Sequence, residues 1–149
     1  MIRELPDSMG YNTILMVVDC LSKQIHAIPT VTSLDSARVT QLFLEHIWHH
    51  HRLPEEVISN RRPTFVSNFS CNLAALLGVK LTPSTSYHPQ TDGQMEHVNQ
   101  EIEAYLQVFV SHRQDDWVDW LPLAEFTYNN KIHAATRRTP FKLNAGQHP

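Results

Sequence analysis

An acidic residue and an amide, separated by 35 residues, are the side chains of this sequence best suited to chemistry. Glu96 follows a turn-rich loop, Asn60 follows the short segment 56–59, and residues 61 to 95 lie between them. Carboxylate and amide oxygens are the ligands that hard cations such as Mg²⁺ accept in proteins. An amide oxygen such as that of Asn60 brings no negative charge and cannot bridge two cations as a carboxylate does.

Glu96 also has a purely structural explanation. The sequence places it near the start of a long amphipathic helix, and the helix dipole favours an acidic residue in the first turn. The sequence motifs around Glu96 are needed to distinguish a functional site from a helix end.

Composition predicts one packed globular domain over residues 1–149, because 42% of the residues are hydrophobic and only 4 are glycine. The net charge of −3 and the pI near 6.3 are not typical of a domain that holds DNA mainly by neutralising phosphates, so strong DNA binding by this domain alone is not expected. Two basic pairs, Arg61-Arg62 and Arg137-Arg138, are either solvated surface or local phosphate contacts.

The two cysteines predict an intracellular protein without a disulfide framework. Cys20 and Cys71 belong to no Cys-x-x-Cys pair and are expected to be buried free thiols. No apolar run approaches the ~18 residues that span a bilayer, and the N-terminus has no apolar signal-peptide segment. No membrane partner is expected.

Strand patterns come first along the chain. Residues 13–18 form a continuous apolar, β-branched run that predicts a strand buried on both faces, and 24–29 alternate polar and apolar residues and predict its hairpin partner. Ser33 or Asp35 is then expected to cap a helix that continues through Ile47 toward Leu53-Pro54.

Helices and strands alternate in the rest of the chain, which predicts an α/β fold. We expect strands at 56–59 and 79–82, a helix over 68–77 ended by Gly78, a helix over 93–111, and a last helix capped by Asp115 or Asp116. The aromatic residues of the last helix are expected in the core or in a dimer interface: Trp117, Trp120, Phe126 and Tyr128.

An ordered set of short motifs runs through nearly the whole chain and resembles the integrase core domain of Gypsy-type LTR retrotransposons, which is similar to retroviral integrases. The motifs are Leu5-Pro6, Val17-Val18-Asp19, Leu53-Pro54, Ser59-Asn60-Arg61-Arg62-Pro63, Tyr87-His88-Pro89-Gln90-Thr91-Asp92-Gly93-Gln94, Val98-Asn99-Gln100, Asp115-Asp116-Trp117, Leu121-Pro122-Leu123-Ala124-Glu125-Phe126, Tyr128-Asn129 and Thr139-Pro140-Phe141. The resemblance implies an RNase H-like fold, a mixed sheet flanked by helices. It also favours the site over the helix-end explanation of Glu96.

The resemblance implies a pair of Mg²⁺ or Mn²⁺ ions held by three carboxylates. Glu96 matches the third carboxylate, Asn60 stands where the family has the second, and the first belongs directly before the segment matching 1–6, so the opening strand is expected to be truncated. Arg62 replaces a glycine and adds positive charge beside the metal position. Asp19 matches a family aspartate outside this triad and is expected to act in the hairpin.

The expected function is DNA integration by a catalytically degenerate core that does not hold a metal pair. The partners implied are DNA, bound weakly by the isolated core, and a second copy in a homodimer, in an intracellular and nuclear setting. A domesticated, non-catalytic DNA-binding or protein-interaction module is the alternative. The nucleic-acid contacts expected from the matched motifs are Arg61, Arg62, Tyr87, His88, Gln90 and Asn99.

Overall fold

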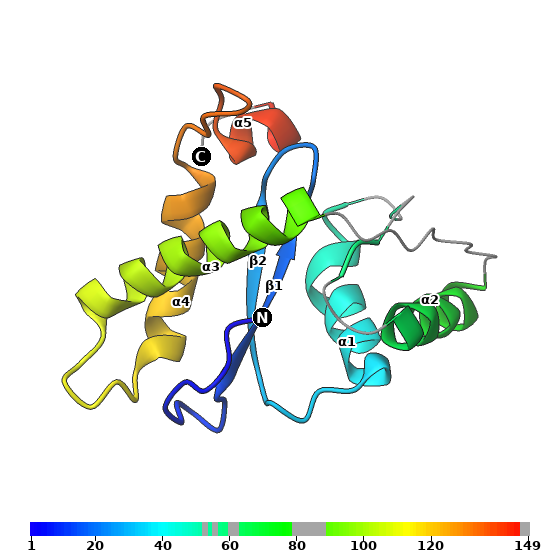
Figure 1. Cartoon of the computed structure of the whole chain (residues 1–149), viewed down its shortest axis with the longest axis horizontal. Helices are drawn as coiled ribbons and strands as arrows, with labels where there is room; N and C mark the ends of the chain where they lie inside the picture. The colour runs from blue at the N-terminus through cyan, green and yellow to red at the C-terminus, as the bar shows by residue number, and fades with distance from the viewer. Residues whose placement is uncertain (52–53, 55–56, 60–62, 79–88, 147–149) are drawn as a thin grey trace. The chain divides into compact units, whose positions relative to one another are not determined.

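A β-hairpin contributes the first large set of buried residues to the core (Figure 1). The computed structural model describes residues 1–51, 54, 57–59, 63–78 and 89–146. Strand β1 (Thr13–Val18) pairs antiparallel with β2 (Ile25–Thr30), with Leu15 opposite Ile28, and both faces of β1 are buried at Ile14, Leu15 and Met16. The hairpin and its burial were predicted from the apolar run, and both are confirmed.

The outer edge of β2 is closed by side chains rather than by another strand. The N–H groups of Ile25 and Ala27 point away from β1 and donate to Asn129 Oδ1 at 2.9 Å and to Glu125 Oε2 at 2.8 Å. Asn129 Nδ2 donates back to the Ile25 carbonyl at 3.0 Å. The next outward position is Pro29, which has no N–H to satisfy. Unpaired donors on an edge strand invite another chain, and here they are occupied.

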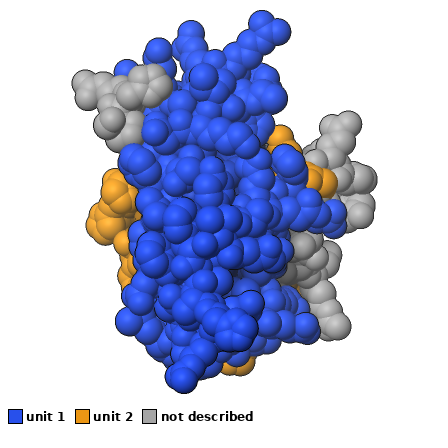
Figure 2. Space-filling view, turned by 90° about the vertical axis from the view of Figure 1, so that its left-hand side faces the viewer, with its two compact units in different colours: residues 1–32, 95–149 blue, residues 33–94 orange. Residues whose placement is uncertain are grey.

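The structure divides into two compact units, coloured separately in Figure 2: unit 1 is Met1–Thr32 with Met95–Pro149, and unit 2 is Ser33–Gln94. Helix α3 (Pro89–Phe109) crosses the division, and α4 (Trp117–Asn129) and α5 (Pro140–Ala145) belong to unit 1. The apolar stripe of α3 packs with α4 and the hairpin. The buried cluster comprises Ile2, Ile14, Met16, Ile25, Ala27, Val98, Ile102, Leu106, Trp117, Leu121, Ala124 and Tyr128.

Unit 2 contains a helical segment that ends in a π-helical turn, and a second helix. Asp35 caps α1 (Ser36–Phe43) by accepting from the Arg38 N–H at 2.8 Å, and a π-helical turn, η1 (Leu44–Trp48), continues it. Helix α2 (Pro63–Leu77) packs on α1 through an edge-to-face contact of Phe43 and Phe69, with ring centroids 5.6 Å apart. Gly78 ends α2 with φ of 66°, as its position predicted.

Two helices begin earlier than expected because each opens on a proline. Helix α2 begins at Pro63 rather than residue 68, and α3 begins at Pro89 rather than residue 93. Proline suits the first position of a helix, since its φ is preset and its missing N–H has no partner there. Helix α5 was not predicted at all, although Thr139, Pro140 and Gly146 are a cap, a first residue and a left-handed end.

Two further expectations need correction. Residues 57–59 lie outside any strand in the structure, because no β-partner pairs with them among the described residues; 56 and the strand expected at 79–82 lie outside those residues. The two cysteines are exposed rather than buried. Cys20 stands in the turn between β1 and β2, and Cys71 stands on an exposed position of α2. The single-domain extent stays a prediction.

Candidate functional site

Glu96 is an exposed side chain within α3. The helix begins at Pro89, so Glu96 is its eighth residue and lies two turns from the helix N-terminus. The helix dipole acts on the first turn and fades beyond it, so it does not explain a carboxylate at this position. The structure therefore removes the helix-end explanation of Glu96.

Asn99 lies one turn after Glu96, so the two side chains share one side of α3. Its side-chain oxygen Oδ1 is buried, and no hydrogen-bond donor reaches it among the described residues. A buried acceptor without a donor is costly and rare in folded proteins, and it calls for a ligand or a neighbour to satisfy it. Asn99 was expected to contact nucleic acid, and that contact stays a prediction.

The other predicted site residues are not placed by the structure. Gln90 lies in the first turn of α3, where only the backbone is described. The remaining residues lie outside the described part of the chain: Asn60, Arg61, Arg62, Tyr87 and His88.

Asp19 organises the hairpin turn, as expected. Its Oδ1 accepts from the Leu21 N–H at 3.2 Å, and its Oδ2 accepts from the N–H and the hydroxyl of Ser22 at 3.2 and 2.6 Å. Among residues 1–51, 54, 57–59, 63–78 and 89–146, no three His, Cys, Asp or Glu side chains are grouped so that they could hold a metal ion. Glu96 alone does not fit a pair of divalent cations, which need several anionic ligands.

A charged cluster joins α3 to the residue Lys131 after α4, and no sequence pattern predicted it. Lys131 Nζ donates to Glu101 Oε1 at 2.7 Å, and His97 Nε2 lies 3.8 Å from the same oxygen. The hydrogen bond to Glu101, and then its charge, raise the pKa of Lys131. Burial, followed by the charge of Glu101, raises the pKa of Tyr128 to about 12, so the phenol is neutral. Glu101 follows Glu96 by five residues, but nothing local marks its partner 30 residues away.

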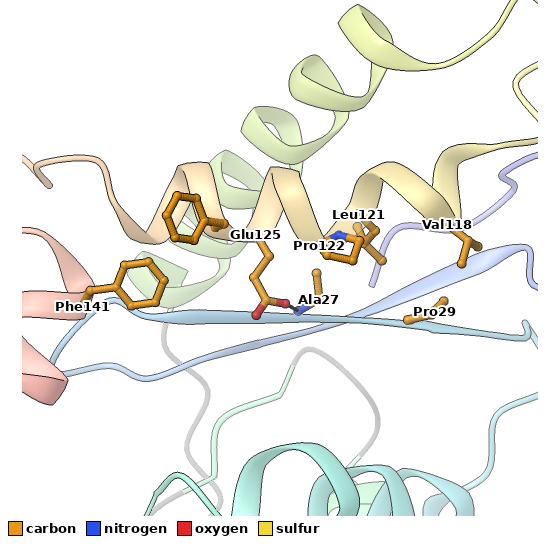
Figure 3. Close-up of a pocket in the computed structure, with 8 residues that line it drawn as sticks. Ala27, Pro29, Val118, Leu121, Pro122, Glu125 and Phe141 are labelled. Carbon is orange, nitrogen blue, oxygen red and sulfur yellow. Dashed lines mark hydrogen bonds between the residues drawn. The ribbon is translucent and has the colours of Figure 1, made fainter. Parts of the chain in front are cut away.

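An open groove of about 490 Å³ lies between β2, α4 and α5 (Figure 3). Glu125 extends from α4 toward the Ala27 N–H at its centre, and the rings of Phe126 and Phe141 stand 5.6 Å apart at one end. The other lining residues are Pro29, Val118, Leu121 and Pro122. One carboxyl in an apolar groove offers no metal site. Trp117 and Tyr128 are buried, as the core expectation required, whereas Phe126 is exposed along this groove.

Replacing Glu125 with glutamine is expected to flatten the pH dependence of stability. Burial raises the pKa of Glu125 above its ordinary 4.5, although the Ala27 N–H opposes the shift. The folded chain therefore binds this proton more tightly than the unfolded chain, and the free energy of unfolding falls as pH rises from about 4.5 through the folded-state pKa. Urea unfolding from pH 4 upward measures the slope.

Asp119→Asn is the matched control, because Asp119 is an exposed carboxylate on the same helix. His26→Gln shows how much of the slope belongs to the imidazole, whose Nδ1 lies 3.8 Å from Glu125 Oε1. An unchanged slope in Glu125→Gln contradicts the assignment.

No helix in the described residues is both long and apolar enough to cross a membrane. No protein-family model matches the chain. The Transposon Tf2-3 and Tf2-4 polyproteins of Schizosaccharomyces pombe are each 34% identical to it over 142 residues, which is 95% of this chain and 11% of each polyprotein. The chain thus spans about one tenth of the length of these relatives.

Two solved structures share its fold. The catalytic core domain of BIV integrase matches with a TM-score of 0.64 and 20% identity, over 95% of this chain and 90% of that one. The HTLV-2 integrase catalytic core domain in complex with magnesium (trimeric form) matches with a TM-score of 0.66 and 15% identity, over 97% and 98%. The expected RNase H-like integrase core fold is confirmed, with two strands in the described residues. The chain is therefore homologous to the Tf2 transposon polyproteins of Schizosaccharomyces pombe over 142 residues, and it has the fold of the BIV and HTLV-2 integrase catalytic core domains.

Proposed function

We propose that this chain is a retrotransposon integrase core that keeps the fold and a DNA partner but has a degenerate metal site. The observation that supports a site at all is Glu96, an exposed carboxylate two turns inside α3 where the helix dipole does not account for it. Asn99 follows one turn later on the same side of the helix and is the proposed nucleic-acid contact beside Glu96.

The proposed degeneracy rests on residue types at the second carboxylate position. Two divalent cations about 3.5–4 Å apart repel each other strongly and need converging negative charge. Asn60 supplies an oxygen without charge, and Arg62 adds a positive charge two residues later. Both residues weaken the binding of a pair of magnesium ions. Magnesium is relevant to this fold because the HTLV-2 integrase catalytic core domain, which shares the fold, was solved in complex with magnesium.

DNA is the proposed partner of the core, through the contacts expected at Gln90, Asn99 and the matched residues outside the described part of the chain. A net charge of −3 predicts that this binding is weak and sensitive to salt. A homodimer and a nuclear location remain predictions from the family.

Purified chain is expected to give no Mg²⁺- or Mn²⁺-dependent product from a labelled branched DNA that integrase cores resolve. Glu96→Gln is the matched control, because it removes the one carboxylate of the proposed site and keeps the shape of the side chain. The two proteins should give equal, background signals, while an active integrase core in the same buffers gives product.

Metal-dependent product above the Glu96→Gln background would show that the site is intact and that the proposed degeneracy is wrong. DNA binding without product supports a core that has kept its DNA partner and lost its catalysis. Absence of both product and DNA binding favours the alternative, a domesticated protein-interaction module.

A further inference from the structure

The loop between α4 and α5, residues 131–138, is a fixed surface feature that we call the basic loop. The His133 N–H donates to the Arg138 carbonyl at 3.0 Å, and the Arg137 N–H donates to the His133 carbonyl at 2.8 Å. The Thr136 hydroxyl also donates to the Arg138 carbonyl, at 3.0 Å. These bonds fold the loop onto itself, and they hold the exposed side chains of Arg137 and Arg138 on a defined backbone.

A second segment brings another cation to the basic loop. Lys23 belongs to the turn between β1 and β2, which lies at the same end of unit 1 as the basic loop (Figure 1). The side chains of Gln24 in that turn and Asn144 in α5 are hydrogen-bonded, which ties the turn to the helix after the loop. Burial and then the charges of Lys23, His97 and Lys131 lower the pKa of His133, against the opposing charge of Glu101. Cations from separate parts of the sequence therefore converge here.

The excess of positive charge is local. Lys23, Lys131, Arg137 and Arg138 carry four positive charges, and Glu101 and Asp19, which shares the turn of Lys23, return two negative charges. This group has a charge of +2 in a chain whose net charge is −3, so the rest of the chain carries −5 with histidines neutral. Such separation of charge attracts an anion to one surface rather than to the whole molecule.

Backbone conformation supplies a separate observation. Arg137 has φ of 54° and Lys23 has φ of 64°, the left-handed region in which glycine or asparagine costs less than a long side chain. Two of the five described non-glycine residues with positive φ are thus cations of this group. Residues held in a costly conformation point to a role for the side chain beyond the fold.

His133 offers a neutral donor within the same loop. Its Nδ1 accepts from the Ala135 N–H at 3.2 Å, so the neutral ring carries its proton on Nε2. A half-buried imidazole with its pKa lowered stays neutral near pH 7 and can donate one hydrogen bond to an anionic oxygen.

We propose that the basic loop together with Lys23 is a contact surface for the phosphodiester backbone of nucleic acid. The inference rests on the proposed function and names a part of the DNA surface outside the matched family motifs of the metal site. Arginine forks bind phosphate oxygens in pairs, and a repeating polyanion can meet several spaced cations at once. A surface of this kind positions the duplex without selecting its sequence.

The test compares two doubly substituted chains with the same loss of charge. Arg137→Asn with Arg138→Gln removes two cations from the loop, and asparagine tolerates the left-handed conformation of residue 137. Arg3→Gln with Arg113→Gln removes two exposed arginines elsewhere on unit 1. Fluorescence anisotropy with a labelled duplex, at several salt concentrations, gives affinity and salt slope, and thermal melts check the fold.

The loop variant should bind at least about tenfold more weakly at low salt, and its salt slope should fall by about 2, because two phosphate contacts are lost. Its melting temperature should stay equal or rise, since the strain at residue 137 is relieved. The Arg3 and Arg113 variant should keep the wild-type slope. Glu101→Gln should bind severalfold more tightly, because the one carboxylate beside Lys131 is neutralised.

If the two double variants lose equal DNA affinity, the loss is explained by net charge alone and the inference is overturned. If the loop variant binds DNA as tightly as the unsubstituted chain, the inference is overturned as well, whereas DNA binding by the core still holds. If the unsubstituted chain binds no duplex at low salt, both the DNA partner and this surface are wrong. Loop-dependent binding of polyglutamate without loop-dependent binding of DNA would assign the surface to an acidic protein instead.

Discussion

Replacing Asn129 with alanine is expected to lower the free energy of unfolding by about 2 to 6 kcal/mol. Asn129 is 1% exposed, and its side chain satisfies both the N–H and the carbonyl of Ile25. Alanine leaves both groups buried without partners, at a cost of about 1–3 kcal/mol each. Domains of this size are stable by only about 5–15 kcal/mol, so the variant loses a large part of its stability. Urea titration with the transition midpoint and slope measured separately tests it.

Asn130→Ala is the matched control, because the same substitution at the next residue removes an exposed side chain at the helix end. A second variant, Asn129→Asp, keeps an acceptor for the Ile25 N–H, loses the donor to the carbonyl and buries a charge. It should therefore also be strongly destabilised. Equal, small effects in all three variants would mean that the edge of β2 is held by other contacts.

Replacing Asn60 with aspartate is expected to tighten Mg²⁺ binding at least about tenfold, since loss of groups that only orient ligands already costs 10- to 100-fold. The added carboxylate supplies the charge that the amide lacks, and Glu96 is its expected partner on the same cation. Calorimetric titration with Mg²⁺ measures the affinity of each variant.

A double-mutant cycle shows whether the two positions serve one ion. Glu96→Gln should have little effect in the unsubstituted chain and should abolish the gain in the Asn60→Asp background, and such a difference measures their coupling. Arg62→Gly should strengthen binding further in the Asn60→Asp background, because it removes an opposing charge. Additive effects of the Asn60 and Glu96 substitutions would place them at separate sites and contradict the motif match.

Local patterns predicted the hairpin, a cap at Ser33 or Asp35, of which Asp35 is the cap, and the helix end at Gly78, because each depends on neighbours within a few residues. The same kind of signal at Thr139 and Pro140 was present and overlooked. The earlier starts of α2 and α3 show that a proline within a turn-rich stretch can be the first residue of a helix rather than the end of a loop.

Local patterns could not predict pairings between residues far apart in the sequence. Ile25 and Asn129 are 104 residues apart, and Glu101 and Lys131 are 30 apart, so no periodicity links them. The position of Glu125 could have predicted one long-range contact. Glu125 lies four positions after buried Leu121, on the apolar side of α4, and a carboxylate there needs a hydrogen-bond donor. For the candidate site, the motif match predicted Glu96 and Asn99, and only the helix start at Pro89 separated Glu96 from a helix end.

The closed edge of β2 sets an order of events during synthesis. The hairpin leaves the ribosome first, while Asn129, which satisfies Ile25, is made 104 residues later. At 5–20 residues per second, this interval is roughly 5 to 20 s. For that time the nascent chain carries open strand donors at Ile25 and Ala27, the groups through which unfinished chains on neighbouring ribosomes can pair with each other. The arrival of α4 ends this period, so synthesis of α4, rather than formation of the hairpin, protects this edge of the newly made protein from aggregation.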